Sequence, residues 1–132
     1  MSKQVFKMSL SRKKNLKMKK RKINKISKLK FKPFTRYGKA IPKLDWFPIN
    51  FNKKTGNGSY FLKFKAGGKS YKHKHLGLEE FLVLKGSLRD SDNTIFKTGD
   101  FVTFKPGSSH FSSSKKGCSL LVFTRGINKI VK

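Results

Sequence analysis

Apolar and polar residues alternate in short runs through the second half of the chain, and glycines, prolines and small polar residues separate these runs. Alternation with a period of two is typical of half-buried strands. The predicted strands cover residues 59–65, 69–75, 81–88, 94–97, 100–105 and 118–125. Six or seven strands at this spacing, with no long amphipathic helix among them, predict an all-β sandwich or barrel.

Three features refine this pattern. The run 81–88, FLVLKGSL, is almost continuously apolar, which indicates a strand buried on both faces. Lysines such as Lys63 and Lys74 interrupt other runs and favour exposed or edge positions there. The last six residues, INKIVK, are interpreted either as a final edge strand or as a loose tail.

The sequence before the strands divides into two parts. Residues 33–58 contain three prolines and several turn residues, which disfavour a continuous helix, and Trp46 marks where apolar surface begins to be buried. We therefore place the domain boundary near residue 43. The prediction is a basic N-terminal arm over residues 1–42 and one β domain over residues 43–132.

Residues 1–32 form a low-complexity segment rich in lysine. Its apolar positions make a thin helical stripe, formed by Leu16, Ile23, Ile26 and Leu29. Because like charges repel along it, the segment is expected to be disordered or partly helical. It is interpreted as an arm that binds nucleic acid or an anionic surface, as a solvated tail, or as upstream sequence ahead of a later start at Met8 or Met18.

The net charge of +27 over 132 residues would normally indicate a polyanion partner. About half of the 33 basic residues lie in the first 44 positions, which contain no Asp or Glu, so the charge belongs largely to the arm. The single cysteine, Cys118, excludes an intramolecular disulfide and is interpreted as a small buried residue rather than a redox thiol. No transmembrane run or secretory signal is present, and a cytoplasmic location is expected.

All three histidines lie between Gly67 and His110. His73 and His75 are two apart on a predicted strand, so both side chains point to the same face. A turn then leads to the pair Glu79 and Glu80, of which only one can face the histidines, and His110 follows a second turn. Three imidazoles and one carboxylate suit Zn, Fe, Mn, Ni or Cu better than Mg or Ca. The alternative is a solvated surface pair of histidines.

Two motifs in this region resemble those of the cupin superfamily. The segment Gly67-x5-His73-x-His75-x3-Glu79-x6-Gly86 matches the first cupin motif at every fixed position. The second motif begins at Gly99 and has Gly107 and His110 in register, with Lys105 in place of its proline and Ser114 in place of its asparagine. These departures affect the turn and leave the ligand positions intact.

From Trp46 to Phe123 the chain resembles the ChrR-like cupins. The resemblance implies a double-stranded β-helix, or jelly-roll barrel, with a divalent transition metal, Zn or Fe, held by His73, His75, Glu79 and His110. Motif spacing favours Glu79 over Glu80 as the carboxylate. Tyr71 shares the face of His73 and is expected either to line the pocket or to cap the barrel mouth.

The family resemblance leaves the activity open between two classes. One is a metal-dependent dioxygenase acting on a small organic substrate, with its catalytic residues unassigned. The alternative is a non-catalytic, zinc-bound sensing or regulatory module, as in the anti-sigma factors that give the family its name. In those factors a helical zinc domain precedes the cupin domain, whereas residues 1–42 here contain no His or Cys to form one. Nucleic-acid binding through the arm is a third hypothesis, and a homodimer is compatible with the apolar strands.

Overall fold

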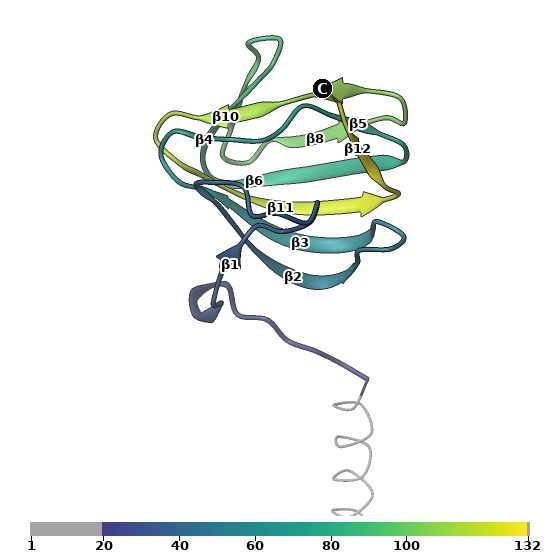
Figure 1. Ribbon diagram of the computed structural model, residues 1–132. Helices are drawn as coiled ribbons and strands as arrows, with labels where there is room; N and C mark the ends of the chain where they lie inside the picture. The colour runs from purple at the N-terminus through teal and green to yellow at the C-terminus, as the bar shows by residue number, and fades with distance from the viewer. Residues whose placement is uncertain (1–19, 132) are drawn as a thin grey trace, which may run out of the picture.

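The computed structural model describes residues 20–131, and nearly all regular structure in this range is β (Figure 1). Nine strands form one strongly curled sheet, and three further strands form a small second sheet. The strands are β1 (Lys32–Pro33), β2 (Leu44–Asn52), β3 (Asn57–Phe64), β4 (Gly68–Lys69), β5 (His73–His75), β6 (Leu78–Asp90), β7 (Ile95–Lys97), β8 (Phe101–Phe104), β9 (Ser109–His110), β10 (Ser112–Ser114), β11 (Cys118–Arg125) and β12 (Asn128–Ile130). The all-β barrel predicted from the sequence is confirmed.

Strand β6 is the centre of the large sheet, whose order is β1-β2-β3-β11-β6-β10-β4, with β7 and β8 also paired to β6. Phe81 and Val83 of β6 point into the barrel and are buried, whereas Leu82 and Leu84 on the outer face are half-buried. Strand β6 is therefore covered on one face, not on both as the apolar run suggested. At Gly86 an added Cβ would lie 2.2 Å from the Gly117 carbonyl oxygen, so only glycine allows β11 to approach so closely.

Two strand assignments differ from the sequence pattern. Strand β2 lies in residues 33–58, where the prolines had predicted irregular structure. A register shift between Pro48 and Asn50 accommodates Pro48, whose backbone nitrogen has no hydrogen to donate. The predicted strand 69–75 is split between β4 in the large sheet and β5 in the small one. The small sheet has the order β12-β5-β9, which makes the C-terminal segment a paired strand and not a loose tail.

The barrel interior holds the apolar core, which includes side chains from a segment that precedes β2. Phe34 and Ile41 are each 3% exposed, and the Phe34 ring packs edge-on against Trp46 with ring centroids 5.1 Å apart. We call residues 34–41 the strap. Figure 1 shows it in dark blue, passing in front of the barrel strands. The division of the chain near residue 43 stays a prediction, and the core contacts place the strap with the barrel.

The remainder of the described N-terminal segment is largely exposed, with Asn24, Leu29 and Phe31 half-buried. One 3₁₀ turn, Ile26–Lys28, has no buried residue, and Ile23 and Ile26 are 69% and 58% exposed. The predicted helical stripe is therefore not formed over residues 20–31, while the prediction for residues 1–19 lies outside the described part. Within residues 20–131 no helix is long and apolar enough to cross a membrane.

Candidate metal centre

The four side chains singled out from the sequence meet inside the barrel. His73 and His75 lie on β5, Glu79 on β6 and His110 on β9, and one ligand atom from each lies within 4.8 Å of all the others. The pairing of β5 with β9 sets His73 directly opposite His110. All four side chains are buried. Burial of this kind contradicts the alternative of a solvated histidine pair.

The Nδ1 atom of each histidine has a partner on the side away from the cluster. His73 Nδ1 donates to the Tyr71 carbonyl oxygen at 2.7 Å, and His75 Nδ1 is 2.9 Å from the Ser108 hydroxyl, which itself donates to a backbone carbonyl. His110 Nδ1 donates to the Asp90 carboxylate at 2.7 Å. These bonds fix the ring orientations and leave the Nε2 atoms for the cluster, as outer partners of metal-binding histidines do.

One buried nitrogen at the centre has no hydrogen-bond partner. His75 Nε2 lies 2.5 Å from Glu79 Oε2, and it is the buried side-chain atom left without a hydrogen-bond partner within the described residues. A buried imidazole nitrogen and a carboxylate oxygen are both metal-ligand atoms, and a shared cation would bind the two. The residues present therefore suit a metal ion.

Glu79 is held from the side opposite the histidines. Its Oε1 accepts from Arg36 Nη1 at 2.8 Å and from Asn128 Nδ2 at 3.2 Å, which leaves Oε2 directed at the cluster. Arg36 lies on the strap and also donates to Tyr60 and Thr124. The Arg36 and Glu79 side chains are 3% and 7% exposed, so the ion pair is shielded from water.

The protonation states suit metal binding. Burial is the main cause that lowers the pKa of His73 to about 4, so its ring is neutral at neutral pH. Burial by itself raises the pKa of Glu79, but the contact with His75 and the charge of Arg36 outweigh it and hold the pKa at about 2. The cluster thus presents a neutral imidazole and a carboxylate without first losing a proton.

The choice between the two glutamates follows from strand alternation. Glu79 faces the barrel interior, whereas Glu80 faces outward and accepts a 2.7 Å hydrogen bond from Thr103 on β8. Tyr71 does not line the interior as one expectation had it. Its side chain is 44% exposed, and it contributes only its backbone carbonyl to the cluster.

Arg36, Asp90 and Asn128 were not found from the sequence. Each contacts a cluster residue from far along the chain, with separations of 43, 20 and 49 residues respectively. Arg36 was also difficult to identify from the sequence because it is one of 33 basic residues, about half of which lie in the expected arm. Cys118 is buried as expected, and burial raises the pKa of its thiol to about 11.

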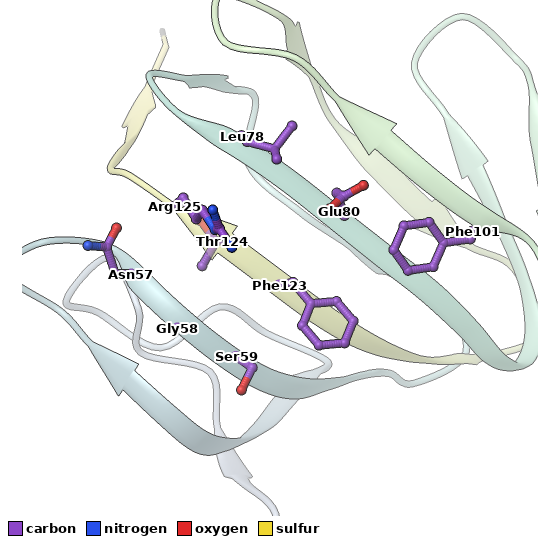
Figure 2. A pocket seen from close by; sticks show the side chains of 9 residues that line it. All are labelled: Asn57, Gly58, Ser59, Leu78, Glu80, Phe101, Phe123, Thr124 and Arg125. Carbon is purple, nitrogen blue, oxygen red and sulfur yellow. The ribbon is translucent and has the colours of Figure 1, made fainter.

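A small void of about 40 Å³ lies beside the cluster and is lined by His73, Glu79 and His110 together with apolar core residues. A much larger depression of about 660 Å³ lies on the outer face of β3, β11 and β6. Figure 2 shows that Phe101 and Phe123 project over this outer face and that no cluster residue borders it. The buried cluster and this outer depression are therefore separate.

Comparisons with known proteins agree with this geometry. The profile of the ChrR cupin-like domain family matches residues 19–128. None of the curated protein sequences compared with the chain matches it. Among solved structures, an acetylacetone dioxygenase from Acinetobacter johnsonii is similar with a TM-score of 0.72 and 16% identity, over 85% of this chain and 78% of that one.

Two further structures share the fold. The polyketide cyclase RemF from Streptomyces resistomycificus has a TM-score of 0.68 and 16% identity, over 85% of this chain and 86% of that one. The anti-sigma ChrR, in complex with SigE of Rhodobacter sphaeroides, has a TM-score of 0.59 and 21% identity, over 76% of this chain and 50% of that one. At these identities the likeness concerns the fold alone.

Proposed function

Because this chain belongs to the ChrR cupin-like domain family, we propose that it is a metal-binding cupin in which His73, His75, Glu79 and His110 hold one divalent transition metal ion. The observation that carries the proposal is the buried His75 Nε2, which has no hydrogen-bond partner and lies 2.5 Å from Glu79 Oε2. Zn and Fe are the metals that we expect first, since imidazole and carboxylate suit both.

The chain's own groups prepare the site. The Tyr71 carbonyl, the Ser108 hydroxyl and the Asp90 carboxylate orient the three imidazoles. Arg36 compensates the Glu79 charge and, with Asn128, aims one carboxylate oxygen at the histidines. When bound, the metal would supply Lewis acidity or, as iron, redox chemistry with dioxygen.

Two candidate activities follow from such a centre. The first is a dioxygenase acting on a small organic compound, and a similar fold belongs to an acetylacetone dioxygenase. The second is a non-catalytic zinc-bound sensing module, and a similar fold belongs to ChrR in its complex with SigE. The buried cluster and the small void beside it favour a role with a small ligand.

Other expectations remain predictions. A polyanion partner would bind the basic residues of the N-terminal segment, and its affinity would fall steeply with salt. A homodimer would bury the outer face that carries Phe101 and Phe123, which are 54% and 41% exposed. A cytoplasmic location also stays a prediction.

Metal analysis of the purified full chain tests the proposal. We expect about one ion per chain in the wild type and its loss in His73→Ala. Lys74→Ala is the matched control, because Lys74 lies between the two histidines of β5 and is exposed. A wild-type chain that holds no metal after expression with excess zinc or iron would contradict the site. Oxygen consumption by the iron form with small organic compounds would then favour the dioxygenase, and zinc as the metal bound on expression, with no oxygen consumption by the iron form, would favour the module.

A further inference from the structure

The strap forms part of the wall of the void beside the cluster. Phe34 and Tyr37 of the strap line this void together with strand residues. Of the lining residues, only these two and Ser70 lie outside strands. The strand residues are fixed by the hydrogen bonds of two sheets, and the strap contributes the aromatic side chains of the wall that lie outside the sheets.

Tyr37 is the less buried of the two strap residues that line the void. Its side chain is half-buried, whereas Phe34 is 3% exposed and belongs to the core. The Tyr37 ring centroid lies 6.2 Å from that of His73. The Tyr37 hydroxyl accepts a 3.0 Å hydrogen bond from Asn128 Nδ2, and Asn128 also donates to Glu79. Tyr37 is therefore tied to the same network that positions the cluster carboxylate.

Arg36 anchors the strap directly beside Tyr37. Its guanidinium donates to Glu79 on β6, Tyr60 on β3 and Thr124 on β11, so it fastens the strap to three strands. An ion pair buried to this degree keeps its geometry because leaving it would strand a charge in the barrel. The neighbouring Tyr37 is thereby held over the void.

The void is small for an organic ligand. At about 40 Å³ it has room for roughly two or three water-sized groups. Pockets for drug-sized molecules measure about 300–1,000 Å³, and a small diketone is several times larger than a water molecule. The other residues that line the void are largely apolar and include Phe81, Leu88 and Leu120. These side chains offer no hydrogen bond to the polar groups of an organic ligand.

We propose that Tyr37 sets the size limit of the ligand that reaches the cluster, and that this limit admits inorganic molecules of two or three heavy atoms, such as dioxygen or azide, and excludes organic molecules as large as acetylacetone. This inference rests on the proposed metal site for its chemistry. Within that site it names the ligand class, which is a small inorganic molecule rather than a diketone.

The test uses the full chain loaded with Co(II), whose visible absorption reports ligand binding. We expect azide, and not acetylacetone, to change the wild-type spectrum. Tyr37→Ala should bind acetylacetone about tenfold or more tightly than the wild type, with azide affinity within about threefold. Tyr37→Phe keeps the ring and removes the hydroxyl, so it should exclude acetylacetone as the wild type does. Tyr71→Ala, an exposed tyrosine away from the void, is the second control.

Acetylacetone binding that is equal in the wild type and Tyr37→Ala would overturn the size limit. Thermal unfolding establishes that each variant is folded, and Tyr37→Leu replaces Tyr37→Ala if the latter is not. If the wild type retains no cobalt, the proposed metal site fails, and benzene then tests the limit on metal-free protein. Benzene should raise the melting temperature of Tyr37→Ala and leave the wild type unchanged, and stabilisation of the wild type would refute the inference.

Discussion

Replacing Arg36 with methionine should destabilise the metal-free protein more than any ordinary surface substitution. The change keeps the length of the side chain but removes the charge paired with Glu79 at 2.8 Å. It also leaves Tyr60 and Thr124 without a donor. Removing one partner of a buried ion pair costs about 3–5 kcal/mol, because the other charge stays buried and uncompensated.

Urea unfolding of metal-free protein, followed by tryptophan fluorescence, measures this loss. Arg125→Met is the matched control, since Arg125 is exposed and its substitution should change the free energy of unfolding by less than about 0.5 kcal/mol. Bound metal should reduce the loss in Arg36→Met, because the cation then compensates the Glu79 charge. A loss below about 1 kcal/mol in the metal-free protein would refute the assignment of a buried ion pair.

Three further predictions concern other groups. Asp90→Asn should weaken metal binding by about 10–100-fold in chelator competition because Asp90 orients His110, whereas the exposed Asp92→Asn should not. The pKa of His73 falls from 6.5 to about 4 on folding. As the pH is lowered, the unfolded chain therefore binds a proton at this histidine at a higher pH than the folded chain does. Metal-free stability should therefore fall by up to about 3 kcal/mol between pH 6.5 and 4 in urea titrations, and a flat profile would contradict this. Cys118, with its pKa raised to about 11, should react with iodoacetamide at pH 8 roughly 100-fold or more slowly in the folded than in the unfolded chain.

The cluster could be predicted partly because its first pair is local and partly because the sequence resembles two known motifs. His73 and His75 share a face through the period of a strand, whereas Glu79 and His110 were assigned by the resemblance to the cupin motifs. The ambiguity between Glu79 and Glu80 was resolved only by the position of β6, which turns Glu80 towards Thr103 on the outer face.

The supporting residues could not be predicted because their contacts are long-range. Nothing near Arg36 in the sequence distinguishes it from the surrounding lysines, and its role depends on where β6 lies. Strand β2 was missed for a different reason. Pro48 indicates an interruption, and the register shift next to it absorbs the missing hydrogen bond without ending the strand.

The strap also has a consequence for biosynthesis. Arg36 bonds to Thr124 and Tyr37 to Asn128, across separations of 88 and 91 residues, so the first part of the barrel to leave the ribosome contacts the last. The Arg36–Thr124 and Tyr37–Asn128 contacts cannot form until residues 124 and 128 have left the ribosome, and contacts of such high sequence separation form slowly. The nascent chain should therefore expose its histidines to cellular metal before the strap covers them, which makes the ribosome-bound stage the interval in which the site is most accessible.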